Sequence, residues 1–174
     1  IGGFHSFDDI FRDKEIFMRW AEMSVFTMTM RTHESIRPNE NWQFDSDDET
    51  LEFFAKMSQR FSYLKPYMQF ISKEYVKKGY PPVRACYLHY ENDPKLHKLK
   101  YQYLFGQDLL VAPVIKPNTT EGEAYLPDDT WIHIWSGKEY KKGLKKIKAP
   151  LGQPPVFYRK DSKFSELFCK LKDV

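Results

Sequence analysis

The 174-residue sequence contains only two cysteines, Cys86 and Cys169, which lie far apart and form no paired motif. Cysteine-based redox chemistry is therefore not expected, although the sequence allows a disulfide between these two residues. The five histidines share no spacing that is typical of metal ligands, so the sequence predicts no metal site. No apolar run approaches the roughly 18 residues needed to cross a bilayer, so no membrane-spanning helix is predicted.

Charge of one sign is not in large excess, because 27 Lys and Arg residues face 24 Asp and Glu residues. This balance gives no reason to expect nucleic acid or another acidic polymer as a partner. A lysine-rich stretch near residue 145 is interrupted by Gly143 and Leu144 and has no interleaved aromatic residues, so we interpret it as a solvated surface. Aromatic residues make up 17% of the chain, and the faces of Tyr and Trp suit sugar rings.

The chain has 41% apolar and 29% charged residues, which is typical of a globular protein. It is shorter than the roughly 250 residues of a complete eight-stranded α/β barrel. It also begins with Ile1-Gly2-Gly3 and not with Met. We therefore expect the carboxyl-terminal part of a longer protein, whose amino-terminal part would be its partner.

Helical spacing dominates the first 80 residues. Arg12-Asp13 opens a helix that runs to about residue 26. The apolar face expected for this helix comprises Ile16, Phe17, Trp20, Met23 and Val25. A second helix should begin in the acidic stretch 45–49, kink or restart at Pro66, and end at Gly79.

The stretch between these helices, residues 28–45, is dense in polar side chains. Thr27–Thr32 alternates in a way that predicts a buried strand, and Pro38 and the Asn residues after it favour a loop. Arg31 and His33 would point to the same side at the end of this strand. The order helix, strand, loop, helix is typical of an α/β barrel, in which polar residues at the carboxyl ends of strands meet substrate.

From Tyr80 onward the spacing changes from helical to strand-like, so we place a domain boundary there, between residues 1–80 and 81–174. The predicted strands are Val83–Tyr90, Leu109–Val114, Glu123–Leu126, Thr130–Trp135, Leu144–Ala149 and Val156–Arg159. The element at Leu99–Phe105 is ambiguous, and Phe164–Leu171 should close the chain as a short helix. Short strands separated by Pro, Asp and Gly turns predict an antiparallel sandwich or small barrel.

Several segments stand out for their order and spacing. They are Ile1-Gly-Gly-Phe4, Arg19-Trp20, Met30-Arg-Thr-His-Glu34, Arg37-Pro38, Asn41-Trp-Gln-Phe-Asp45 and Leu109-Leu-Val-Ala-Pro-Val114. Together they resemble the carboxyl-terminal part of glycoside hydrolase family 31, and within it the sulfoquinovosidase branch. The resemblance implies that residues 1–80 are the last segments of a (β/α)8 TIM barrel and that residues 81–174 are a proximal β-sandwich domain with a terminal helix.

The resemblance also implies that the bond-breaking groups lie elsewhere. Family members are retaining α-glycosidases with two carboxylates roughly 5 Å apart. Both matching motifs lie upstream of Ile1, so we expect no catalytic residue in this chain. Asp8, Asp9 and Asp13 match no family motif.

Three residues are expected to bind substrate. His33 matches the family histidine that hydrogen-bonds sugar hydroxyls beside the scissile bond, and a neutral imidazole both donates and accepts. Arg31 is expected mainly to order the site by bonding carboxylates or carbonyls of the barrel. Phe4 stands where sulfoquinovosidases resemble one another in having a tyrosine, whose hydroxyl helps to hold the sulfonate through water. In the α-glucosidases of the family this residue is Phe.

The expected function is hydrolysis of an α-glycoside through a covalent glycosyl intermediate, and Phe4 favours an α-glucoside as the carbohydrate substrate. A sulfoquinovosidase or α-galactosidase is the alternative, and so is a catalytically inactive carbohydrate-binding relative. The chemistry needs only two carboxyl groups and water, so no cofactor is expected. The tripeptide Asn118-Thr119-Thr120 fits a glycosylation acceptor, which favours the secretory pathway or the lysosome, while the sequence leaves the compartment otherwise open.

Overall fold

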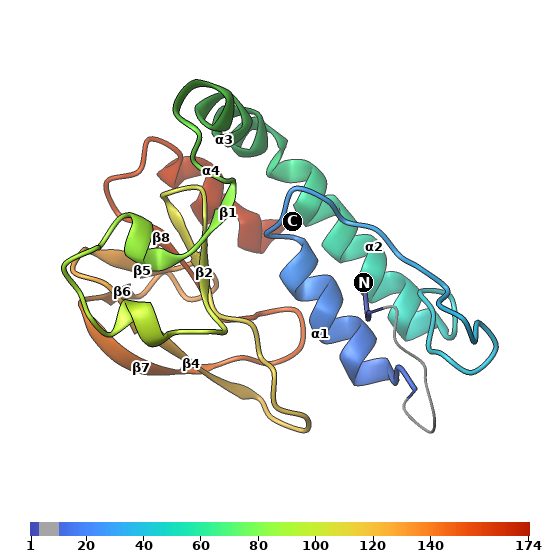
Figure 1. Ribbon diagram of the computed structural model, residues 1–174. Coiled ribbons are helices and arrows are strands. Elements are labelled where there is room, and N and C mark those ends of the chain that lie inside the picture. The colour runs from blue at the N-terminus through green and yellow to red at the C-terminus, as the bar shows by residue number, and fades with distance from the viewer. Residues whose placement is uncertain (4–10) are drawn as a thin grey trace.

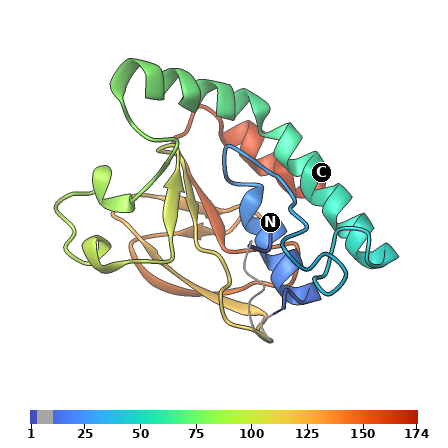
Figure 2. The ribbon, with the colours of Figure 1, turned by 45° about the vertical axis from the view of Figure 1, so that its right-hand side comes forward.

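The computed structural model describes residues 1–3 and 11–174, and it arranges them as a helical layer beside a β region (Figure 1). The layer contains α1 (Lys14–Ser24), α2 (Asp48–Tyr63) and α3 (Lys65–Lys78). Helices α2 and α3 follow one another along one edge of the molecule, and the short helix α4 (Ser165–Cys169) lies beside them (Figure 2). The layer therefore combines helices from both ends of the chain.

The two helix starts predicted from acidic residues are confirmed. The Asp13 carboxylate accepts a hydrogen bond from the Ile16 amide at 2.8 Å, and the Asp47 carboxylate accepts one from the Thr50 amide at 2.7 Å. Each cap satisfies a backbone N–H that the helix leaves unpaired, which is typically worth about 1 kcal/mol. Asp47 also accepts a hydrogen bond from Lys14 at 2.6 Å, and this bond lowers the pKa of Asp47 to about 2.

The predicted restart at Pro66 is confirmed as well, because α2 ends at Tyr63 and α3 begins at Lys65. Pro66 lies in the first turn of α3, where a backbone N–H would have no intrahelical acceptor. Gly79 ends α3 with a φ of 78°, a left-handed conformation that glycine adopts without steric cost.

The predicted apolar face of α1 is only partly correct. Phe17 and Val25 are buried, whereas Ile16 and Trp20 are 42% and 40% exposed. The buried side of the helix also carries a charged residue, Arg19, because this side meets polar backbone groups of the β region.

The β region is antiparallel throughout its described pairings, as predicted. One sheet has the strand order β1-β2-β3-β8-β5-β6, and β4 and β7 form a second sheet. The strands are β1 (Val83–Arg84), β2 (Tyr103–Phe105), β3 (Leu109–Val111), β4 (Glu121–Leu126), β5 (Trp131–His133), β6 (Glu139–Tyr140), β7 (Gly143–Lys148) and β8 (Val156–Arg159). A buried cluster joins Leu110 and Phe157 of the larger sheet to Ala124 and Ile147 of the smaller one, so the two sheets share a core as in a β-sandwich.

The strand predicted at Val83–Tyr90 is too long. Only Val83–Arg84 pairs with a neighbouring strand, and Cys86–Leu88 forms a 3-10 helix. The Arg84 side chain is buried and donates a hydrogen bond to the Glu74 carboxylate of α3 at 2.7 Å. This ion pair joins the end of β1 to the helical layer.

The two cysteines do not form the disulfide that the sequence allows. Cys86 is buried and Cys169 is exposed, and both are free thiols. Burial raises the pKa of the Cys86 thiol to about 11. Among the described residues, no helix is long and apolar enough to cross a membrane, and no group of three or more His, Cys, Asp or Glu side chains is arranged to hold a metal ion.

The helical layer and the β region share one hydrophobic core around Tyr67 of α3. The Tyr67 ring makes edge-on contacts with Phe105 of β2 and Phe168 of α4, at centroid distances of 5.8 Å and 4.9 Å. Its hydroxyl donates to the Phe105 carbonyl at 2.8 Å. A Cβ at Gly106 would lie 2.1 Å from this hydroxyl, so the approach of α3 to the sheet requires glycine there.

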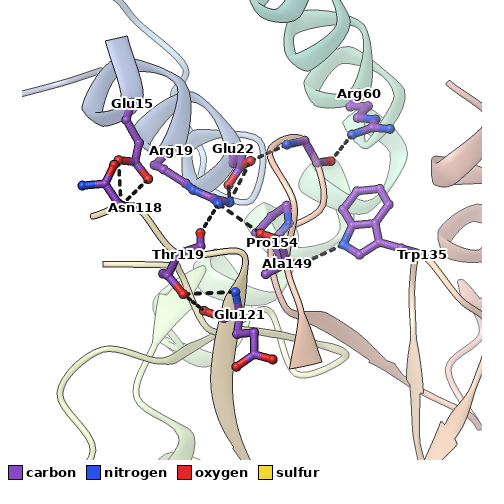
Figure 3. A network of polar contacts seen from close by, with 11 residues as sticks. Glu15, Arg19, Glu22, Arg60, Asn118, Thr119, Glu121, Trp135, Ala149 and Pro154 are labelled. Carbon is purple, nitrogen blue, oxygen red and sulfur yellow. Dashed lines mark hydrogen bonds and ion pairs between the residues drawn. The ribbon is translucent and has the colours of Figure 1, made fainter. Parts of the chain in front are cut away.

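A polar junction joins α1 to the β region (Figure 3). Arg19 donates to the carbonyls of Thr119 and Ala149 at 2.8 Å and 3.0 Å, and it forms an ion pair with Glu22 at 3.1 Å. Glu22 also accepts a hydrogen bond from the Gly152 amide. Burial raises the pKa of Glu22 to about 7, and the charge of Arg19 opposes that rise.

Helix α2 holds the same loop from its other side. Arg60 donates to the carbonyls of Gly152 and Val174 at 2.6 Å and 3.1 Å, and its guanidinium lies 4.6 Å from the centre of the Trp135 ring. Trp135 in turn donates to the Pro154 carbonyl at 2.5 Å (Figure 3). The loop 149–154 is therefore fixed by both helices, and α1 has a defined place against the sheets.

Candidate functional site

The chain between α1 and α2 carries two of the predicted site residues, Arg31 and His33. The strand predicted at Thr27–Thr32 is wrong, because this segment forms no strand in the structure. The Arg31 carbonyl accepts a hydrogen bond from the Ile1 amino group at 2.6 Å, and the His33 carbonyl accepts one from Arg12 at 3.0 Å. Hydrogen bonds from two unrelated donors do not make the repeated ladder that defines a strand.

His33 lies in an exposed part of this segment. Its Nδ1 accepts a hydrogen bond from the Ser35 amide at 2.8 Å. Ser35 adopts a φ of 69°, an unusual conformation for a residue with a side chain, and this turn brings its amide back toward the imidazole. Because Nδ1 is the acceptor, the neutral ring carries its proton at Nε2, where it is a hydrogen-bond donor.

Arg31 lines a cavity of about 410 Å³ beside the carboxyl end of α1. The other lining residues are Ile1, Trp20, Met23, Ser24, Thr27, Met28 and Thr29. His33 is not among them, so the two predicted residues do not line the same cavity. Apart from Arg31 the cavity wall is mainly apolar or hydroxylic, which suits packing by further protein or by the face of a sugar.

Phe4, the third predicted substrate-binding residue, lies outside the described residues, as do Asp8 and Asp9. The two glycines before it are described, and both have positive φ values, 81° at Gly2 and 78° at Gly3. The sequence therefore uses glycine here because the backbone turns in a way that other residues resist.

The loop after His33 is attached to the start of α2. Trp42 donates from Nε1 to the Thr50 hydroxyl at 2.9 Å, and the Lys14 ammonium lies 5.6 Å from the centre of the Trp42 ring. Asn41 is buried, and its side chain accepts a hydrogen bond from the Arg12 amide at 3.0 Å. These contacts fix the far end of the loop that begins at His33.

Sequence reasoning missed the contribution of Arg12. It assigned this residue only to a helix start, whereas the structure buries it and gives it contacts to three separate segments. An arginine beside a helix cap is usually solvated, and no sequence pattern around it indicates burial. Only the folded positions of residues 1–3, 33 and 41–43 reveal its role.

Two domain models of glycosyl hydrolases match this arrangement of helices followed by packed antiparallel sheets. The model of the glycosyl hydrolases family 31 TIM-barrel domain matches residues 1–69, and the model of the glycosyl hydrolase family 31 C-terminal domain matches residues 79–162. This chain belongs to glycoside hydrolase family 31.

Individual relatives agree with this assignment. The chain is 46% identical over 174 residues to a sulfoquinovosidase from Escherichia coli, covering 100% of this chain and 26% of that protein. It is 31% identical over 165 residues to a 1,3-alpha-isomaltosidase from Kribbella flavida, covering 89% of this chain and 23% of that protein. The chain thus spans about a quarter of the length of these curated relatives.

A solved structure shows the same fold. The chain superposes on a family 31 sulfoquinovosidase from E. rectale, in complex with an aza-sugar inhibitor, with a TM-score of 0.97 and 43% identity. The match covers 99% of this chain and 26% of that one. The fold expected from the sequence, barrel segments followed by an antiparallel β domain, is confirmed.

Proposed function

We propose that this chain is part of a retaining α-glycoside hydrolase and forms one wall of its substrate pocket. The observation that carries the proposal is the 46% identity to a sulfoquinovosidase along the whole chain. The two carboxylates of the reaction, roughly 5 Å apart in retaining enzymes, would come from the remainder of the same protein. One would form the glycosyl intermediate, and the other would act as acid and then as base.

The exposed apolar side chains near α1 support this division of labour. Ile16 is 42%, Trp20 is 40% and Met28 is 37% exposed. Apolar residues gathered beside a cavity mark a surface that is suited to cover by further protein. We infer that other barrel segments of the same protein cover it.

The proposed substrate is an α-sulfoquinovoside, because the similar proteins with the fullest coverage carry that activity in their names. A neutral α-glucoside is the second candidate, and Phe4 is the observation that favours it. The resemblance described above implies that sulfoquinovosidases use a tyrosine hydroxyl at this position, and phenylalanine has none. Comparing kcat/KM for 4-nitrophenyl α-sulfoquinovoside and 4-nitrophenyl α-glucoside with the full-length enzyme decides between them.

His33 would bind the sugar through its Nε2 proton. The change His33→Ala in the full-length enzyme should lower kcat/KM at least tenfold, since a hydrogen bond to the sugar is lost, and a factor of ten corresponds to about 1.4 kcal/mol. The melting temperature should stay nearly unchanged, because His33 is exposed.

The matched control is His97→Ala, which removes an exposed histidine on the β region whose Nε2 lies 3.2 Å from the backbone carbonyl of Glu91. It should leave kcat/KM unchanged. Equal kinetics for the wild type and the His33 variant would remove His33 from the pocket. Failure of the wild type to hydrolyse either glycoside would reject the proposed activity itself.

A further inference from the structure

Arg12 is a nearly buried cation, with 4% of its surface exposed. All three guanidinium nitrogens donate hydrogen bonds. The acceptors are the Trp42 carbonyl at 2.7 Å, the His33 carbonyl at 3.0 Å, the Ile1 carbonyl at 3.1 Å, the Gly3 carbonyl at 3.4 Å and the Gln43 side-chain oxygen at 2.9 Å. One side chain therefore contacts residues 1–3, residue 33 and residues 42–43, which are remote from one another in sequence.

The main chain of Arg12 extends the same connection. Its carbonyl accepts a hydrogen bond from the Trp42 amide at 2.8 Å, and its amide donates to the Asn41 side chain at 3.0 Å. Asp13, the next residue, caps α1. The start of α1 thus fixes the position of Arg12. The hydrogen bonds of its guanidinium in turn hold the surrounding loops in place relative to α1.

The acceptors of Arg12 are carbonyl and amide oxygens, not carboxylates, in the part of the chain that the structure describes. Burial lowers the pKa of Arg12. A guanidinium directed at several backbone carbonyls has a planar, fixed arrangement of donors. It therefore fixes the directions and the spacing of the peptide groups that it contacts, which a single ammonium group does less well.

Gly2 fits closely under the same side chain. Its φ is 81°, and a Cβ built on it would lie 1.9 Å from the Cδ of Arg12. The Arg12 side chain therefore crosses the backbone where Gly2 has no side chain in the way. Any larger residue at position 2 would displace Arg12 from its acceptors.

We propose that Arg12 is a positioning residue for the sugar site, holding the His33 backbone at a fixed distance from residues 1–3 and from the loop 41–43. This inference rests on the proposed function, because His33 is the group that would touch the sugar. Arg12 does not touch substrate and acts through His33. Its loss would leave the imidazole present but wrongly placed for its hydrogen bond.

The test uses the full-length enzyme and the variant Arg12→Lys, which keeps the charge but loses the planar set of donors. We expect kcat/KM for the hydrolysed α-glycoside to fall at least tenfold. We also expect the double variant Arg12→Lys/His33→Ala to be no slower than His33→Ala alone, because both changes remove the same interaction. Losses that multiply in the double variant would overturn the proposal.

Two matched controls separate positioning from general destabilisation. Arg60 is also buried and also bonds backbone carbonyls, those of Gly152 and Val174, so Arg60→Lys should lower the melting temperature without changing kcat/KM. Gly2→Ala should reproduce the kinetic loss of Arg12→Lys. Gly79→Ala, which has a φ of 78° but no atom within 4 Å of its added Cβ, should not.

Hydrogen exchange gives a readout that does not depend on the choice of sugar. Arg12→Lys and Gly2→Ala should speed exchange in peptides covering residues 29–45, whereas Arg60→Lys and Gly79→Ala should not. If the wild type hydrolyses no α-glycoside, the proposed function fails, and exchange alone then decides whether Arg12 holds this segment. Unchanged exchange in these peptides, or faster exchange with kcat/KM within twofold of wild type, would overturn the role of Arg12.

Discussion

The side chain of His133 predicts a specific dependence of stability on pH. His133 belongs to β5 and is 6% exposed. Its Nδ1 lies 2.9 Å from the Ser136 hydroxyl, while its Nε2 is buried and has no hydrogen-bond partner among the described residues. Protonation would place a cation at this unpartnered nitrogen, against the ring of Phe157 at 5.2 Å.

Burial accordingly lowers the pKa of His133 from 6.5 to about 4. The unfolded chain binds a proton at this residue below pH 6.5, whereas the folded chain does so only near pH 4. The stability contribution is therefore complete above pH 6.5 and is lost as the pH falls toward 4. Between pH 7.5 and pH 5 the loss amounts to about 2 kcal/mol, because each pH unit of unequal protonation corresponds to about 1.4 kcal/mol.

The assay is hydrogen exchange of the β8 amides, which reports the free energy of opening the larger sheet at each pH. His133→Asn retains a polar group near the Ser136 hydroxyl but does not titrate. We expect it to lower the opening free energy at every pH and to flatten its dependence between pH 7.5 and pH 5 by about 2 kcal/mol. His97→Asn, on the surface, should leave the wild-type pH dependence intact. Identical pH dependence in wild type and His133→Asn would refute the reasoning.

Two further predictions concern packing and thiol chemistry. In chemical denaturation, Gly106→Ala should lower the free energy of unfolding by more than about 2 kcal/mol, because the new Cβ would lie 2.1 Å from the Tyr67 hydroxyl. Gly137→Ala, at a similar φ of 68° but in open space, should lower it by only about 1 kcal/mol. Under native, non-reducing conditions iodoacetamide should label Cys169 and spare Cys86, with both labelled after unfolding; protection of both in the unfolded protein would reveal a disulfide.

The helices were predictable because their signals are local. A capping Asp13 or Asp47 needs only the next three residues to act, and Gly79 needs only its own φ. Pro66 excludes an uninterrupted helix wherever the rest of the chain lies. The antiparallel β region was predictable for a related reason, since alternation and turn residues such as Gly137 are read within a few positions.

The strand errors arise from partners that a sequence does not reveal. Thr27–Thr32 has strand-like alternation, but a ladder also requires a neighbouring backbone along its length. Leu109–Val114 is apolar throughout, yet strand β3 ends at Val111. The Ala112 amide still donates to the Pro155 carbonyl at 3.0 Å, and Pro113 has no N–H with which to continue. In both segments, side-chain character indicated what the residues prefer, and backbone pairing decided what they form.

The candidate site divides in the same way. His33 was predicted because its neighbours resemble a family motif, and that resemblance supplied a role that its exposure alone would not. Arg12 had no such neighbours, and its acceptors come together only in the fold. Residues that touch substrate are constrained by chemistry that a motif records, whereas a residue that positions them is recognised by geometry.

The domain boundary that we propose near residue 80 separates helical from strand-like sequence spacing. The residues on its two sides nevertheless share one hydrophobic core. Tyr67, on one side of the boundary, packs against Phe105 and Phe168 on the other, and all three are fully buried. The Arg19 guanidinium, on the first side, donates hydrogen bonds to the carbonyls of Thr119 and Ala149 on the second side. Helix α1 is held by the β region and leads directly into the segment that carries His33. The β region is thus part of the support of the proposed pocket, and its separation from the barrel segments would remove the surface on which α1 is placed.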